Sequence, residues 1–154
     1  MEEKTLANNT ISKITEDFRD LLKERNVPFE VNEQDPNMMR LRTKLPNNDS
    51  ITPLVFIHVN DANSALSLAL SQMVRFNEPG IDVYKAINEF NLDSESFGCK
   101  MFIDERGELI VLVNAIVKGE SPRKQIEDYL NISILAIDKH MGKILEIIKN
   151  SENN

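Results

Sequence analysis

The side chains best suited to chemistry are one cysteine, Cys99, and two histidines, His58 and His140. A cysteine nucleophile needs a positioned histidine to activate it, and the sequence places neither histidine near Cys99. The spacing of the two histidines matches no metal-ligand motif. The sequence therefore predicts structural, hydrogen-bonded histidines and a buried, unreactive thiol at Cys99.

Motifs typical of catalysis or cofactor binding are missing. The five glycines are scattered rather than grouped in a phosphate-binding loop. There is no nucleophile elbow, zinc-protease helix, paired-cysteine motif or calcium loop. The acidic pairs Asp104–Glu105 and Glu127–Asp128 fall in a turn and on a helix face, where surface charge is the usual role. We therefore expect a protein that is not an enzyme and that has no cofactor and no metal site.

The charge balance narrows the class of partner. The 154 residues contain 18 Lys and Arg against 25 Asp and Glu, a net charge of −7, which disfavours nucleic-acid binding. The first ten residues lack the apolar core of a signal peptide, and no apolar run is long enough to cross a membrane. A single cysteine excludes an internal disulfide framework. We expect one domain over residues 1–154, in the cytoplasm.

Three segments have the apolar spacing of helices. The expected N-terminal caps are Thr10, Asp82 and Ser121, with Pro122 at the first position of a long closing helix. That closing helix is amphipathic, and Asp138 is predicted to lie on its solvated side. The predicted helices span residues 10–26, 82–90 and 122–148.

Alternating apolar residues predict strands between these helices. Residues 64–76 fit both kinds of element: the residue propensities favour a helix, whereas the pattern favours a strand, and we predict a strand. The other expected strands span residues 29–33, 38–45, 54–59, 98–103 and 109–117. The predicted fold class is α+β, a bent antiparallel sheet of about six strands with an N-terminal, a middle and a long C-terminal helix.

The last predicted strand is apolar on both faces and therefore needs cover on both sides. We expect Ile110, Leu112 and Ile116 to contribute to a partner or dimer surface. The closing helix is also more apolar than a single core-facing stripe requires, because it carries Ile132, Leu135 and Leu145 outside that stripe. Those three residues belong to the same expected surface.

A row of cations is predicted on one face of the strand 38–45. Arg40, Arg42 and Lys44 alternate with apolar residues, which is typical of the solvated face of an antiparallel sheet. An anionic partner that contacts these three side chains is the alternative.

Two short segments resemble the YbjN-like family. These are Ala86–Asn91, at the end of the middle helix, and Gly98–Asp104, followed by a glycine turn. The family's fold is similar to that of type III secretion chaperones, which are small, acidic, cytosolic and usually dimeric. The resemblance implies a chaperone-like or regulatory protein that binds another polypeptide. Asn88 and Asn91 match the family pattern, and we expect them to form helix-end hydrogen bonds.

Two functions from different classes remain open at this point. The first is a homodimer that binds another polypeptide of unknown identity, without enzymatic activity and without nucleic acid or membrane as a partner. The alternative is a small-ligand-binding protein or enzyme with a pocket between sheet and helices. That alternative predicts that polar groups such as His58, Asn114 and His140 converge.

Overall fold

The computed structural model describes residues 10–60 and 62–152. The first nine residues, over which a signal peptide was considered, lie outside this range. The elements in chain order are α1 (Lys13–Glu24), β1 (Glu30–Val31), β2 (Met38–Arg42), β3 (Leu54–Asn60), β4 (Ala65–Ser71), α2 (Ile81–Leu92), the 3₁₀ turn η1 (Ser94–Ser96), β5 (Cys99–Ile103), β6 (Leu109–Ile116) and α3 (Pro122–Glu152). The α+β class is confirmed, and the ambiguous segment contains a strand, β4.

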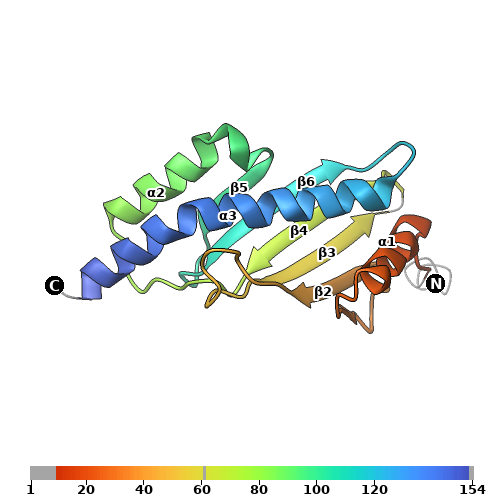
Figure 1. Cartoon of the computed structure of the whole chain (residues 1–154), viewed down its shortest axis with the longest axis horizontal. Helices are drawn as coiled ribbons and strands as arrows, with labels where there is room; N and C mark the ends of the chain where they lie inside the picture. Colours follow the sequence, from red (N-terminus) through yellow and green to blue (C-terminus); the bar gives the residue numbers. More distant parts are fainter. Residues whose placement is uncertain (1–9, 61, 153–154) are drawn as a thin grey trace, which may run out of the picture.

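The strands form one open antiparallel sheet in the order β1-β2-β3-β4-β6-β5. The chain runs through β1 to β4 as successive hairpins and then leaves the sheet through α2. It returns at the edge as β5, and β6 comes back between β5 and β4. In Figure 1, α3 runs across the strands, with α2 beside one end of the sheet and α1 beside the other.

Two helix starts differ from the sequence prediction. The N-cap of α1 is Ser12 rather than Thr10, and its hydroxyl accepts the backbone N–H of Thr15 at 3.1 Å. The N-cap of α2 is Gly80 rather than Asp82, which lies in the first turn of the helix. The closing helix begins at Pro122 as predicted.

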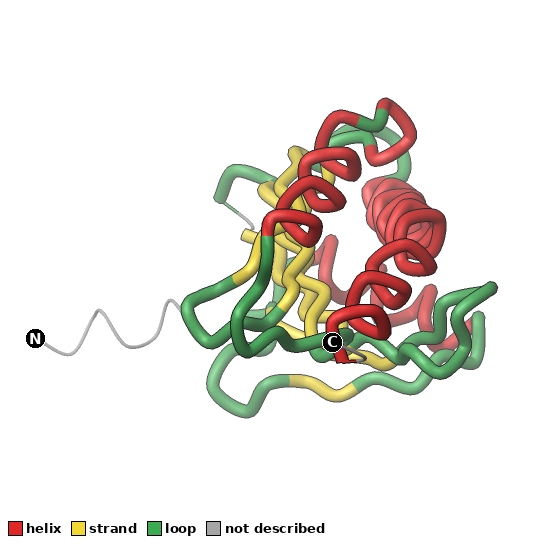
Figure 2. The backbone as a smooth tube through the Cα atoms, turned by 90° about the vertical axis from the view of Figure 1, so that its left-hand side faces the viewer, coloured by secondary structure: helices red, strands yellow, loops and turns green. Residues whose placement is uncertain are grey.

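The core lies between one face of the sheet and the helices. Phe18 of α1, Phe90 of α2 and Ile137 of α3 contribute large buried side chains from the helical layer. Figure 2 shows α1 and α3 on the same side of the strands. The buried residues of β2 to β6 that face this layer are all apolar: Met39, Leu41, Val55, Ile57, Val59, Leu66, Leu68, Leu70, Met101, Leu109, Val111 and Val113.

The turn between β5 and β6 contacts the segment that follows β4. Gly107 has φ +83° and its carbonyl accepts the backbone N–H of Phe76 at 2.7 Å. A Cβ atom at position 107 would collide with the carbonyl oxygen of Phe76. Glycine is therefore required here both for the left-handed backbone and for the close approach.

Asp138 is buried, which contradicts its predicted place on the solvated side of the closing helix. The loop after β2 folds over α3 and brings two asparagines to this carboxylate. The Asn47 side-chain amide donates to it at 2.8 Å and the Asn47 backbone N–H at 3.0 Å, while the Asn48 amide donates at 3.0 Å. Helical spacing could not reveal this, because the contact joins segments that are distant in sequence.

Candidate functional site: the open face of the sheet

The face of the sheet opposite the helices carries a second group of apolar side chains. On β6, Ile110 and Leu112 are half-buried and Ile116 is 53% exposed. None of these three residues belongs to the core cluster. We call this surface the open face, and its apolar residues on β3 to β6 are Leu54, Phe56, Ala65, Ala69, Phe102, Ile110, Leu112 and Ile116.

Strand register brings these residues side by side although they come from four segments of the chain. Phe56 lies opposite Ala69, which lies opposite Leu112. Phe102 of β5 lies opposite Ile110 on the far side of β6. Neighbouring strands are about 4.8 Å apart, so these side chains form one continuous apolar centre.

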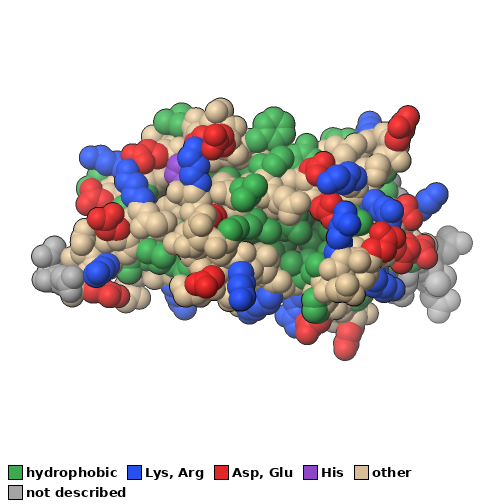
Figure 3. Space-filling view, in the orientation of Figure 1, with side chains coloured by type: hydrophobic (Ala, Val, Ile, Leu, Met, Phe, Trp, Pro, Cys, Tyr) green, Lys and Arg blue, Asp and Glu red, His purple; other side chains and the backbone are tan. Residues whose placement is uncertain are grey.

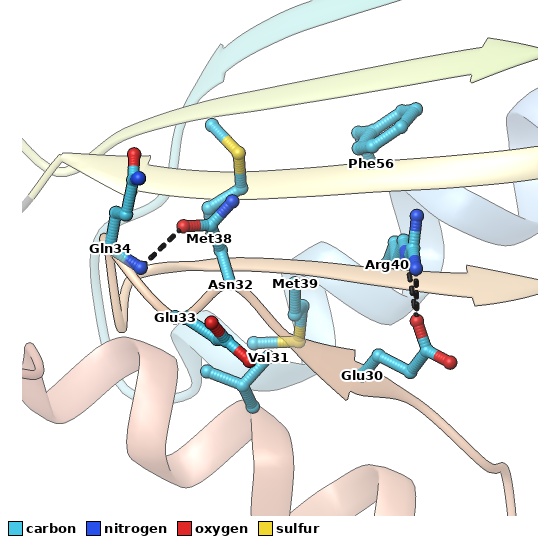
Figure 4. A pocket seen from close by; sticks show the side chains of 9 residues that line it. All are labelled: Glu30, Val31, Asn32, Glu33, Gln34, Met38, Met39, Arg40 and Phe56. Carbon is cyan, nitrogen blue, oxygen red and sulfur yellow. Dashed lines mark hydrogen bonds and ion pairs between the residues drawn. The ribbon is translucent and has the colours of Figure 1, made fainter.

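Two hollows border the open face at the β1–β2 edge of the sheet. The larger, of about 630 Å³, includes Met38, Arg40 and Phe56 in its wall (Figure 4). The smaller, of about 420 Å³, is lined in part by Arg42 and Leu54. Both hollows share the Glu30–Arg40 ion pair, with a contact of 2.6 Å, so the pair separates them. Phe56 and Leu54 connect the hollows with the apolar centre.

The predicted row of cations is shorter than expected, because β2 ends at Arg42 and Lys44 lies in the exposed loop beyond it. Arg40 pairs with Glu30. Arg42 donates to the backbone carbonyl of Thr52 at 3.0 Å and to the side-chain carbonyl of Gln72. Anion binding by Arg40, Arg42 and Lys44 stays a prediction.

The expected partner residues of α3 do not lie on the open face. Leu135 is 61% exposed and Ile132 is half-buried, whereas Leu145 packs against the core. Phe97, also 61% exposed, stacks on Tyr129 with ring centroids 6.5 Å apart. Tyr129, Ile132 and Leu135 follow one another at steps of three residues along α3. We call Phe97, Tyr129, Ile132 and Leu135 the α3 patch.

The six predicted partner residues therefore fall into two groups on opposite sides of the molecule. Ile110, Leu112 and Ile116 lie on the open face, and the helix residues lie on the other side. Figure 3 shows this helical side, where apolar side chains gather over the middle and charged groups lie towards both ends.

The three polar groups proposed for a ligand pocket do not converge. His58 Nε2 lies 3.1 Å from an Asp35 carboxylate oxygen on the open face. The Asn114 carbonyl oxygen accepts the hydroxyl of Ser67 at 2.9 Å on the same face.

His140 lies in the helical layer, where its Nε2 is 2.8 Å from a carboxylate oxygen of Asp93. Its ring meets Phe90 edge-on with centroids 5.2 Å apart. Lys139 also pairs with Asp93, and this hydrogen bond is the main reason that the pKa of Asp93 is far below its ordinary value. Each of the three groups thus has its own partner, and the described residues offer no pocket built from all three.

Cys99 is half-buried on the edge strand β5, and burial raises the pKa of its thiol to about 11. Asn91, at the end of α2, forms hydrogen bonds to strand β5 rather than the predicted bonds at its own helix end. Its amide donates to the carbonyl of Met101 at 3.0 Å, and its carbonyl accepts the N–H of Met101 at 2.8 Å. Asn88 is exposed.

Metal-binding clusters and membrane-spanning helices are both missing from residues 10–60 and 62–152. This part of the chain contains no group of three or more His, Cys, Asp or Glu side chains placed to hold a metal ion. None of the helices in these ranges combines the length and the apolar character that a membrane span requires.

No protein-family model matches the sequence, and no curated protein matches it. Among solved structures, it is similar to a chain of the ExsC–ExsE complex, with TM-score 0.58, 15% identity, and coverage of 82% of this chain and 89% of that chain. It is also similar to YbjN from E. coli, a proposed transcription regulator, with TM-score 0.52, 14% identity, and coverage of 82% and 92%.

A third similar structure is a chain of the ExoU–SpcU heterodimer from the type III secretion system of Pseudomonas aeruginosa. The TM-score is 0.49 with 12% identity, and the match covers 81% of this chain and 93% of that chain. The YbjN-like fold that residues 86–104 suggested is thus the fold of this chain, as its similarity to YbjN and to the ExsC–ExsE structure shows.

Proposed function

We propose that this protein acts by binding another polypeptide, without enzymatic activity of its own. The observation that carries this proposal is the open face, an apolar centre spread over four strands that does not belong to the core. Contiguous exposed apolar surface is uncommon on soluble monomers and is typical of interaction sites. The fold likeness adds support, because ExsC is found in a complex with ExsE.

We also propose that the protein is a homodimer that associates through the α3 patch. Leu135 points away from the core in the middle of a long helix, beside the Phe97–Tyr129 stack. The cations near this surface already have partners: Lys139 pairs with Asp93 and Glu95, and Lys143 pairs with Glu89. Two identical surfaces could therefore approach without leaving like charges opposed, as an isologous dimer requires.

Native mass spectrometry tests the dimer. We expect the wild-type protein at twice the 17.6 kDa of one chain, and Leu135→Glu at the mass of one chain. Leu92→Glu is the matched control, because Leu92 is 77% exposed but lies outside the α3 patch. A strictly monomeric wild type, or a dimer that survives Leu135→Glu, would overturn this assignment.

A pull-down from native lysate tests polypeptide binding, with bound proteins identified by mass spectrometry. We expect proteins that are captured by the wild type and by Leu92→Glu and that are lost with Leu112→Glu, because the added carboxylate lies in the apolar centre. Circular dichroism checks that the variants are folded. If Leu112→Glu captures everything that the wild type captures, the open face is not the binding surface.

A further inference from the structure

We propose that the open face binds a partner segment with acidic residues on both sides of an apolar centre, and that a second copy of this chain does not cover it. This inference rests on the proposed polypeptide-binding function and specifies the chemistry of the partner. It follows from the charges that border the apolar centre.

The strands place three cations but one anion on the open face. Arg40 and Arg42 come from β2 and Lys100 from β5, whereas Glu30 of β1 is the anion. The whole chain has a net charge of −7, whereas the strand residues of this face include more cations than anions. An acidic protein with a locally cationic binding face can attract an anionic partner that the rest of its surface would repel.

Three carboxylates near this face already have partners, whereas Glu33, which lines the larger hollow, has no ion-pair partner among the described residues. Glu30 pairs with Arg40 at 2.6 Å, and Asp35 lies 3.1 Å from His58. Glu108, just before β6, accepts the backbone N–H of Gln72 at 2.6 Å, and Arg75 lies opposite it in the sheet.

Of the three cations that the strands place on the open face, two therefore remain available. Arg42 bonds to the neutral groups of Thr52 and Gln72, and Lys100 is exposed. Neither has a carboxylate partner in the part of the chain that the structure describes.

The two available cations lie on opposite sides of the apolar centre. Arg42 is opposite Leu54 on one side, and Lys100 is opposite Leu112 on the other. Four strand spacings separate β2 from β5, which is about 19 Å. Because Arg42 is also two residues along the strands from the row of Lys100, a partner that uses both cations needs acidic groups about 20 Å apart with apolar side chains between them. That span corresponds to roughly 13 residues of helix or roughly six residues of extended chain.

A second copy of this chain fits the face poorly. Two copies could pack their open faces together with their strands aligned. If the two-fold axis of such a dimer runs parallel to the strands and over β4, then β2 of one copy lies over β5 of the other. Arg40, which lies in the same row as Lys100 across the sheet, would then face Lys100. An axis perpendicular to the strands places β2 over β2, and at the level of Leu41 it would bring Arg40 of one copy opposite Arg42 of the other. Both arrangements oppose cations of the two copies, and the carboxylate that each copy brings, Glu30, already pairs with Arg40.

A phage-displayed library of random peptides, each about 16 residues long to cover the 13-residue helical span, provides the probe. Peptides are selected on the wild-type protein after depletion on the Ile110→Glu/Leu112→Glu double variant. We expect the selected peptides to be rich in Asp and Glu around apolar residues. Synthetic peptides are then compared by fluorescence anisotropy with counterparts in which Asn and Gln replace the acids, and we expect about tenfold weaker binding of the counterparts.

Reversing charges on the protein tests which residues cause the preference for acidic peptides. Arg42→Glu/Lys100→Glu should weaken binding of the acidic peptide by about tenfold and leave its amide counterpart within about twofold. Lys85→Glu/Lys149→Glu changes the net charge equally at exposed positions in α2 and α3 and should alter binding less than about threefold. Equal effects of the two double variants would show a general charge effect and overturn the proposal.

The remaining outcomes separate this inference from the function on which it rests. If the selected peptides are neutral or basic, the proposal of an acidic partner is overturned, whereas the proposed polypeptide-binding function still holds. A wild-type dimer that Leu112→Glu dissociates in native mass spectrometry shows that a second copy covers the face, and this also overturns the proposal. If no peptide is enriched and Leu112→Glu loses no captured protein, both proposals fail.

Discussion

The two faces of β6 are similar in sequence and different in environment. Leu109, Val111 and Val113 are at most 1% exposed beneath the helices. Ile110 and Leu112, which alternate with them, are half-buried on the other face and do not belong to the core cluster. The apolar character of a strand therefore shows that both faces need contacts, but it does not show which face folding itself will cover.

The covered face also has polar contacts that hold its cover in place. Asp138 connects α3 to the loop after β2, and Asn91 connects the end of α2 to β5. Polar contacts on the open face, such as His58 with Asp35 and Ser67 with Asn114, join strands to their loops or to one another and attach no covering element. The helical layer is thus fixed by long-range hydrogen bonds, whereas the open face is left free for a separate molecule, as we propose.

The strongest test of the difference between the two faces places the same charge on adjacent residues of β6. Val111→Asp puts a carboxylate into the core without a partner and should cost more than about 3 kcal/mol of unfolding free energy. Leu112→Asp exposes its carboxylate to water on the open face and should cost about 1 kcal/mol. Urea denaturation followed by circular dichroism measures both. Equal losses would mean that the open face is covered in the folded chain.

A smaller effect is expected from removing the carboxylate that holds α3 against the loop after β2. Asp138→Ala leaves the donors of Asn47 and Asn48 without their acceptor and should cost about 1–3 kcal/mol. Asp128→Ala is the control, because that carboxylate is exposed and pairs with Lys124 at 2.8 Å. It should cost less than about 0.5 kcal/mol.

The difference between wild type and Asp138→Ala should depend on pH. Burial acts to raise the pKa of Asp138, but the hydrogen bonds from Asn48 and Asn47 outweigh it, so the net pKa is lowered. The stabilisation is therefore fully present above the unfolded value of about 3.9 and is lost as the pH falls through the lower folded pKa. Urea midpoints measured from neutral pH down to about pH 2.5, below that unfolded value, test this. A difference that grows towards low pH would contradict it.

The mildest test leaves stability almost unchanged and compares thiol reactivity on the two faces. Because burial raises the pKa of Cys99 to about 11, its labelling by a disulfide reagent at about pH 8 should be about two orders of magnitude slower than that of an ordinary thiol. Its rate should rise about tenfold per pH unit between about pH 8 and about pH 10. A cysteine at position 67, Ser67→Cys in a Cys99→Ser chain, lies at an exposed position of the open face, and its labelling rate should level off above about pH 9. Equal pH profiles would count against the difference in burial.

Much of the fold follows from local patterns in the sequence. Alternation predicted β2, β3 and the doubly apolar β6, and the Ser121-Pro122 pair predicted where α3 begins. The pattern also predicted a strand within residues 64–76. It did not predict that Gln72 has φ +56°, a left-handed backbone just after β4 that ends the alternation.

The arrangement of the candidate surfaces could not be predicted in the same way. Leu112 and Leu135 were predicted to share one surface because each is an apolar residue outside the stripe or face that was expected to contact the core. The structure places them on opposite sides of the sheet. Lys100 was missed as a cation of the open face because its place beside Leu112 depends on β5 joining the edge of the sheet. Such neighbours are set by strand order, which short-range spacing does not determine.

The paired hydrogen bonds between Asn91 and Met101 have a consequence for misassembly. They occupy the outward N–H and carbonyl of Met101 in the middle of β5, the groups that a foreign strand would need to extend the sheet there. At the opposite border, β1 shields β2 over a register of two residues. If this protein forms fibrils or strand-exchanged oligomers under stress, growth should therefore start from the β1–β2 border. The side-chain amide of Asn91 accounts for this difference between the two edges of the sheet.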